Sequence, residues 1–332
     1  MTTSLRTVNT SLQRIDPVRA AQEQDRRKKR LMAILSKGLP TLPSYVLDLN
    51  SLLSSPSVDL RKVGKVIRTD PSLTAQVLRL CNSALFGLRR RVISIEQAAV
   101  LIGIERLRTL VLTCSVMQFA GKRLPPAQLT AFWQHSFLTA LLSERIARQT
   151  DYFEKEQAYL GGLLHDIGQL PLWLLVVEEE VAGRALPPED WPDNVAIERE
   201  YFGMDHCKVG RWIAMAWNFM PSFVDVFEFH HSIDKAKHDP YLVGIVAAAD
   251  QFLATQSDAA PLQPEDGIPQ PEVQLTPQAE SPSFINACLP LLSESDCTAL
   301  MDTLRTEYIH LLPVVQIGLT AVTMGVSEKA GA

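Results

Sequence analysis

The chain has 332 residues, a formal net charge of −5 and 46% hydrophobic residues. This length allows a large buried core in one or two compact units, and the mild acidity argues against a general affinity for nucleic acid. The five cysteines are odd in number and none has Cys-x-x-Cys spacing, which argues against a disulfide framework or zinc ribbon and is typical of the reducing cytosol.

Residues 1–30 are predicted to form a flexible polar and basic arm, because residues 1–25 lack a hydrophobic period and an apolar signal-peptide core. The basic run 26–30 has two interpretations: the start of a solvated helix, which we favour, or a patch that contacts phosphate or membrane. No helix-turn-helix or finger signature accompanies the run, so we do not expect nucleic acid as a partner.

Residues 31–123 contain signals for several short helices. Ser57, Asp70-Pro71 and Ser94 each precede apolar positions at helical spacing, and their side chains can accept the free amide protons of a first turn. A further helix is expected over 104–117. Strand alternation bounded by hairpin turns is absent, so this part is predicted to be a helical lobe.

Residues 124–256 are predicted to form a second helical lobe. Amphipathic spacing indicates helices over 126–149 and 155–165. Capping residues or prolines predict four more helices: from Asp193 to Phe202, from Asp205 to Trp217, from Pro221 to His230-His231, and from Asp239-Pro240 through Asp250.

The composition changes after residue 256. Residues 257–283 hold six prolines among polar residues and are interpreted as a linker or loop. Residues 284–332 are predicted to be a C-terminal helical segment. Its run Leu311–Val326 is shorter than the roughly 18 residues that a membrane span requires, so we interpret it as a buried helix and expect no span.

The histidines gather in one part of the chain. Five of the seven lie between residues 135 and 231, and His165-Asp166 stands where a helix should end. Asp250 follows three alanines, whose small side chains would let another helix approach closely. Nitrogen and oxygen ligands together suit iron, manganese, zinc or magnesium. Taken singly, each residue also has a structural explanation, as a core histidine, a helix cap or an ion-pair partner.

The order His135, His165-Asp166, Asp250 resembles the HD superfamily of metal-dependent phosphohydrolases. The additional histidines resemble the extended ligand set of its HD-GYP branch, in which two or more metals bind. The resemblance implies that Asp166 bridges two ions, which would polarise a phosphoryl oxygen and activate water. The implied metal ligands are His135, His165, Asp166, His206, His230, His231 and Asp250.

Two departures from the HD-GYP pattern concern catalysis. Gln169 stands where a lysine commonly follows His-Asp-x-Gly, and the segment 232–238 lacks the Gly-Tyr-Pro sequence. Both a positive charge for phosphate and the loop that shapes a cyclic-dinucleotide pocket are therefore missing, so we do not expect hydrolysis of cyclic di-GMP.

From about residue 39 to 255 the chain resembles the HDOD (HD-related output domain) family. The resemblance implies an all-α fold, with an N-terminal helical lobe packed on an HD-like lobe, and a cytoplasmic role in bacterial signalling that touches motility or stress. The matching segments are Leu39–Pro43, Asp70–Leu73, Leu78–Gly87, Ile93–Ala98, Leu101–Gly103, Phe132–Ser136, Gly161–Gly168, Asp205-His206, Trp217 and His230-His231.

We therefore expect a regulatory protein that does not catalyse a reaction and acts on a signalling partner by contact. A metal or small molecule could occupy its HD-like pocket. The alternative is a metal-dependent phosphohydrolase acting on a nucleotide or another phosphoester. Asn82 and Ser83 are interpreted as satisfying backbone groups where a helix ends, with a bridge between the lobes as the other possibility.

Overall fold

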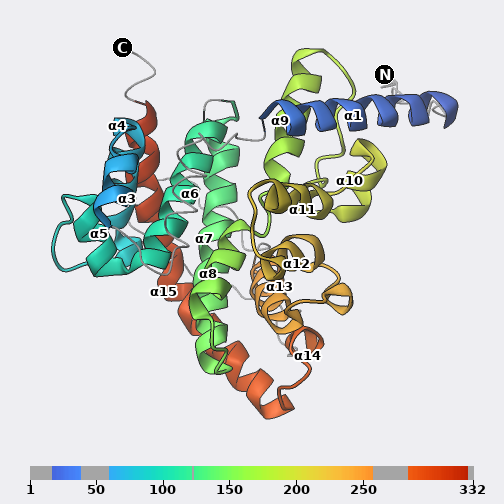
Figure 1. Ribbon diagram of the computed structural model, residues 1–332. Coiled ribbons are helices and arrows are strands. Elements are labelled where there is room, and N and C mark those ends of the chain that lie inside the picture. Colours follow the sequence, from blue (N-terminus) through green and yellow to red (C-terminus); the bar gives the residue numbers. More distant parts are fainter. Residues whose placement is uncertain (1–16, 39–59, 122, 257–282, 328–332) are drawn as a thin grey trace, which may run out of the picture.

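The computed structural model describes residues 17–38, 60–121, 123–256 and 283–327, and within these ranges every regular element is a helix (Figure 1). The all-α prediction is therefore confirmed. The predicted cap Ser57, the opening segment Leu39–Pro43 and nearly all of the Pro-rich segment lie outside the described residues.

The first lobe begins at its predicted caps. Asp70 accepts from the amides of Ser72 and Leu73, and Ser94 accepts from the amide of Gln97. Its elements are α3 (Leu60–Ile67), α4 (Pro71–Cys81), η1 (Ala84–Phe86), α5 (Ile95–Ile102) and α6 (Ile104–Gly121).

Asn82 has the local role that its position suggested. Its Nδ2 donates to the carbonyls of Leu78 and Val92, 2.8 Å away in each case, and its Oδ1 accepts from the amide of Val92 at 2.7 Å. Ser83 donates to the carbonyl of Leu80 at 2.7 Å. These bonds hold the loop between η1 and α5 against the end of α4.

The second lobe also follows most of its predicted boundaries, and Asp205 and Asp239 cap helices as expected. The prediction of Asp193 as a cap is wrong by one residue: Asn194 caps α10, while Asp193 has a left-handed φ of 63°. The elements are α7 (Pro126–Gln149), α8 (Lys155–Leu164), α9 (Gln169–Val181), α10 (Val195–Phe202), α11 (His206–Ala216), α12 (Pro221–Phe229), η2 (Ile233–Lys235) and α13 (Pro240–Ala254).

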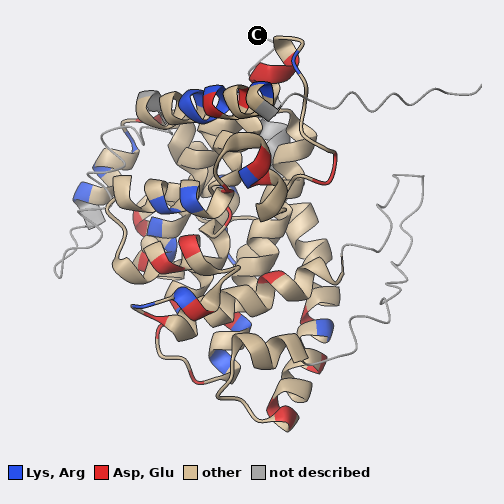
Figure 2. Cartoon of the chain, turned by 90° about the vertical axis from the view of Figure 1, so that its right-hand side faces the viewer, with Lys and Arg blue, Asp and Glu red and all other residues tan. Residues whose placement is uncertain are grey.

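The basic run 26–30 lies in the middle of α1 (Pro17–Gly38), so the prediction of a loose arm or a solvated helix start fails from Pro17 onward. Basic residues outnumber acidic ones along this helix (Figure 2). Arg26 forms two hydrogen bonds with the buried carboxylate of Glu179, at 3.0 and 2.5 Å, and Arg30 pairs with Glu178 at 2.7 Å. The run therefore fastens α1 to α9.

Helix α7 forms the centre of the molecule. It buries Trp133 and Phe137 and crosses α8 so closely that a Cβ on Gly162 would lie 2.8 Å from the carbonyl oxygen of Thr139. Helices α14 (Ser283–Cys288) and α15 (Glu294–Ser327) follow the gap in the described chain. Helix α15 runs through Pro313 and packs on α7, α4 and η1, so it contacts both lobes (Figure 1).

The run Leu311–Val326 belongs to α15 and is buried on one face only over its described side chains, with Val315 covered and Ile317 exposed. Among the described residues, the stretch Lys155–Val181 is long and apolar enough for a membrane span by length and composition. The chain turns between α8 and α9 inside this stretch, and 89% of its apolar window is buried, as in a core helix pair.

Candidate metal centre

Five helical elements bring the predicted ligands together. His135 projects from the middle of α7, His165 and Asp166 occupy the turn after α8, His206 begins α11, and Asp250 comes from α13. His230 follows the last residue of α12.

The approach of α11 to the His165-Asp166 turn depends on Gly168. A Cβ at this position would lie only 1.9 Å from the carbonyl oxygen of His206.

One half of the centre joins α7, the α8–α9 turn and α13. His135 Nε2 lies 3.2 Å from Asp250 Oδ1 and 3.3 Å from His165 Nε2. Asp166 Oδ2 lies 3.4 Å from His165 Nε2 and 3.7 Å from His135 Nε2. His135, His165 and Asp250 thus have ligand atoms within 4.8 Å of one another, close enough to share one ion.

The other oxygen of the same aspartate faces the second half. Asp166 Oδ1 lies 3.5 Å from His206 Nε2 and 3.4 Å from His230 Nε2, and these two nitrogens are 3.3 Å apart. His231 stands at the partly exposed edge, where its Nε2 is 3.2 Å from Asp193 Oδ1. The structure thus brings six predicted residues together and places His231 beside them, with Asp193, predicted to be a helix cap, as its neighbour.

Hydrogen bonds on the outer side fix the orientation of three imidazoles. His165 Nδ1 lies 2.8 Å from the carbonyl oxygen of Gly162, and His230 Nδ1 lies 2.9 Å from that of Val226. A carbonyl only accepts, so each Nδ1 carries a proton, and each Nε2 presents a lone pair to the centre when the ring is neutral.

Glu198 plays the same part for His206. Its carboxylate is 2.8 Å from Nδ1 and also accepts from the backbone amide of His206 at 2.8 Å. Glu198 is fully buried and was missed from the sequence, because nothing local marks a glutamate on α10 as a partner of α11.

This arrangement is suited to a cation. Asp166 Oδ1 is buried and accepts no hydrogen bond within the described chain, and His230 Nε2, which faces it, offers a lone pair because the lowered pKa of His230 keeps this ring neutral. A lone pair that faces a carboxylate oxygen cannot form a hydrogen bond with it unless a proton lies between them. Imidazole nitrogens and carboxylate oxygens are the donors that divalent transition metals prefer, so the residues fit such an ion, which would displace imidazole protons on binding.

Burial lowers the pKa of His165 and of His206, but Asp166 beside His165, and Cys207 and Glu198 beside His206, outweigh it and raise both pKa values well above the usual value. Burial raises the pKa of Asp166, but the neighbouring imidazoles, His165 foremost, outweigh it and hold that pKa well below its usual value. Burial, assisted by His231, lowers the pKa of His230 to about 4, so its ring is neutral near pH 7. In the described part of the chain, no lysine or arginine forms an ion pair with Asp166 or Asp250.

The sequence model of the HDOD domain family matches residues 39–233, which is more than half of the chain. The chain belongs to the HDOD family. Asp250 and α15 lie beyond the matched range. An uncharacterised protein of Treponema pallidum is 26% identical over 225 residues, which cover 65% of this chain and 42% of that protein's length.

Solved structures share the fold. An HDOD domain protein of unknown function from Geobacter sulfurreducens is 24% identical, with a TM-score of 0.64 over 89% of this chain and 98% of its own. A candidate phosphohydrolase from Shewanella amazonensis is 25% identical, with a TM-score of 0.60 over 88% and 97%. A candidate signal-transduction protein from Marinobacter aquaeolei is 18% identical, with a TM-score of 0.61 over 91% and 66%.

Proposed function

We propose that this HDOD protein is a cytoplasmic bacterial signalling component that binds two divalent metal ions without hydrolysing a phosphoester and regulates partner proteins by contact. One observation carries the metal part of the proposal: the two oxygens of Asp166 face two separate groups of imidazole Nε2 atoms. His135, His165 and Asp250 would hold one ion and His206 and His230 the other, with His231 at the edge of the second.

Ions held in this way would supply Lewis acidity, and the residues around them determine whether it is used. Gln169 Nε2 donates to Asp166 Oδ2 at 2.9 Å, so the position of the expected lysine serves to orient the aspartate. A phosphate ester brought here would meet two buried carboxylates, and neither forms an ion pair with a lysine or arginine of the described chain. The lack of such an ion pair among these residues supports a binding role over a hydrolytic one.

A phosphohydrolase remains the second proposal, because the centre is open on one side. The His135 side chain is 31% exposed, and those of His231 and Asp193 are 25% and 41% exposed. A substrate could therefore reach the ligand atoms. The structural relative named as a candidate phosphohydrolase agrees with this alternative.

Elemental analysis of protein purified without chelators tests the metal site. We expect stoichiometric iron, manganese or zinc in the wild type and its loss in Asp166→Ala. Asp70→Ala is the control, because it also removes a carboxylate but lies in the first lobe, where it caps α4, and should keep its metal. A folded wild type that binds no divalent metal after anaerobic reconstitution would refute the site.

A phosphoester screen on the metal-loaded protein separates the two functions. Turnover that disappears in Asp166→Ala and persists in Asp70→Ala would replace the regulatory proposal with the hydrolytic one. Absence of turnover in protein that holds its full metal content supports the regulatory proposal.

A further inference from the structure

We propose that the hollow between α5 and α15 docks an amphipathic helix of a partner protein that carries acidic residues beside its apolar face. This inference extends the protein-contact part of the proposed function and rests on it, but it does not depend on the metal centre. It arises from a cavity, an uncovered apolar helix face and a group of unpaired arginines that lie together.

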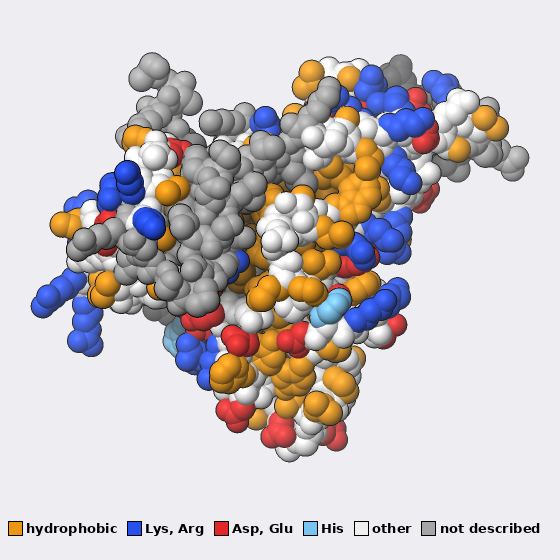
Figure 3. Space-filling view, viewed as in Figure 1, with side chains coloured by type: hydrophobic (Ala, Val, Ile, Leu, Met, Phe, Trp, Pro, Cys, Tyr) orange, Lys and Arg blue, Asp and Glu red, His pale blue; other side chains and the backbone are white. Residues whose placement is uncertain are grey.

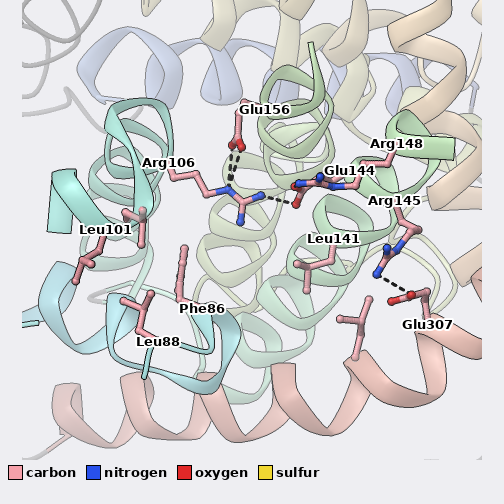
Figure 4. Close-up of a pocket in the computed structure, with 12 residues that line it drawn as sticks. Phe86, Leu88, Leu101, Arg106, Leu141, Glu144, Arg145, Arg148, Glu156 and Glu307 are labelled. Carbon is pink, nitrogen blue, oxygen red and sulfur yellow. Dashed lines mark hydrogen bonds and ion pairs between the residues drawn. The ribbon is translucent and has the colours of Figure 1, made fainter. Parts of the chain in front are cut away.

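The cavity has a volume of about 540 Å³. It shares no lining residue with the metal centre and is bounded by the η1–α5 region on one side and α15 on the other, with α7 between them (Figure 4). Phe86, Leu88 and Leu101 line the first side, and Leu141 and Leu311 line the part toward α7 and α15. The rest of the wall is charged and paired within itself, through Arg106, Glu144, Arg145, Arg148, Glu156 and Glu307. Such a volume is large enough for two or three apolar side chains of a bound helix.

The apolar lining continues onto the outer surface of α5. This helix buries Ile95 and Ala98 against the lobe, yet its Val100 and Leu101 are 74% and 47% exposed, and Ile93, just before it, is 76% exposed. Exposed apolar side chains that lie together commonly mark a contact site for another molecule. Within the described residues, the outer face of α5 presents such side chains next to the cavity.

Positive charge surrounds this apolar surface. Residues 60–103 contain eight lysines or arginines and two acidic residues, although the whole chain has a net charge of −5. Figure 3 shows Lys and Arg side chains projecting from the lobe of α3 and α5, with hydrophobic side chains between them. Arg89, Arg90 and Arg91 directly follow the cavity residue Leu88, are all exposed, and form no ion pair with any described residue.

These three arginines are poorly placed for stability. They precede the N-terminus of α5, where the partial positive charge of a helix favours acidic residues. Glu96, in the first turn of α5, already pairs with Arg68 of α3. The arginines at the far end of the cavity are paired as well, Arg145 with Glu307 at 2.7 Å. The unpaired charge therefore lies on the α5 side, where carboxylates of a partner would meet it.

The combination favours a protein over the other polyanions. A bilayer surface is too flat to fill a hollow between two helices, and a nucleic-acid backbone offers no apolar side chain for the leucine-lined wall. An amphipathic helix can place its apolar positions in the cavity and its carboxylates on Arg89–Arg91 at the same time.

Selection from a displayed peptide library tests this chemistry while the partner is unidentified. The probe is a phage library of random peptides of about 16 residues, long enough for roughly 24 Å of helix. It is selected on the immobilised full chain, with counter-selection on the variant Arg89→Glu, Arg90→Glu, Arg91→Glu. We expect enriched peptides to have apolar residues at helical spacing and an excess of Asp and Glu.

Fluorescence anisotropy with an enriched peptide then gives the magnitude. The triple charge reversal should weaken binding at least about tenfold, since it removes three rim contacts and makes them repulsive. Leu101→Asp should weaken binding in the same way through the cavity wall. The matched control is Arg19→Glu, Lys235→Glu, Lys237→Glu, which changes the net charge equally at exposed sites elsewhere and should bind within about twofold of the wild type.

The opposite results would overturn the proposal. They are enrichment of peptides without acidic bias, affinity unchanged by both α5-side variants, or no enriched peptide while anionic vesicles or duplex DNA bind through the three arginines. The metal content of each variant is measured in parallel. Peptide binding that survives in metal-free Asp166→Ala would show that the docking surface stands even if the metal proposal fails.

Discussion

Replacing Gly168 by alanine should disturb the centre without touching a ligand. The new Cβ would lie 1.9 Å from the carbonyl oxygen of His206 and 2.7 Å from the amide nitrogen of Gly210, whereas real Cβ contacts essentially never fall below 3.0 Å. The obstacle is backbone on both sides, so no rotamer change relieves it. The start of α11 must retreat from the His165-Asp166 turn by at least about 1.1 Å, the difference between these distances.

A retreat of this size affects both stability and metal binding. Overpacking of a dense interior costs about 1–3 kcal/mol, so the urea midpoint and the melting temperature should fall. His206 Nε2, now 3.5 Å from Asp166 Oδ1, would move by several times the roughly 0.2 Å tolerance of a metal–ligand bond. We therefore expect about half of the metal to be lost, from the His206–His230 side.

The matched control is Gly121→Ala at the end of α6, where an added Cβ meets nothing within 4 Å. It should change stability by less than about 1 kcal/mol and leave the metal content intact. If Gly168→Ala unfolded at the same urea concentration as the wild type and kept its full metal complement, the close approach of α11 to the turn would be refuted.

Three further perturbations address separate contacts. Burial raises the pKa of Asp225, but amide and imidazole hydrogen bonds from the His238 turn outweigh it and hold that pKa below its usual value. A folded pKa below the unfolded one gives stability that is present above the unfolded pKa and lost as pH falls through the folded one. Asp225→Ala should thus cost about 2 kcal/mol at pH 7 in urea titrations and progressively less as the solution is acidified below about pH 4. Glu179→Ala should release α1, seen as faster amide exchange over residues 17–38 with exchange in α13 unchanged. Glu198→Gln should weaken metal binding about 10–100-fold by loosening the hold on His206, measured by competition with a chelating dye.

Each of these three predictions has an outcome that would contradict it. A stability loss for Asp225→Ala that is constant with pH would mean that its charge is unimportant. Protected amides in α1 of Glu179→Ala would assign the docking of α1 to its apolar contacts. Unchanged metal affinity in Glu198→Gln would remove the positioning role of this glutamate.

Local signals explain most of what could be predicted from the sequence. The caps Asp70 and Asp205 act on amides two or three residues away, so the sequence alone contains the interaction. The resemblance to HD proteins added a common location for six residues that lie on five separate elements, which spacing alone could not have placed together.

The failures concern contacts between distant segments. The basic run of α1 was interpreted as solvated because Glu178 and Glu179, its partners, lie about 150 residues away in sequence. Asp193 was mistaken for a cap because the surrounding loop sets its left-handed backbone conformation, and no residue pattern in the sequence predicts that conformation. Glu198 was not predicted for the same reason, because its role depends on a contact with His206 on another helix.

The length of α15 makes unfolding a shared event for the two lobes. Its 34 residues extend about 51 Å and touch α4 and η1 at one end of their path and α7 along the rest. Arg145 pairs with Glu307, and Gln149 donates to Thr303 at 2.8 Å, so α7 and α15 are joined by polar contacts as well as by packing. Unfolding of either lobe would remove the packing contacts of part of α15. Local opening of one lobe is therefore coupled energetically to the other.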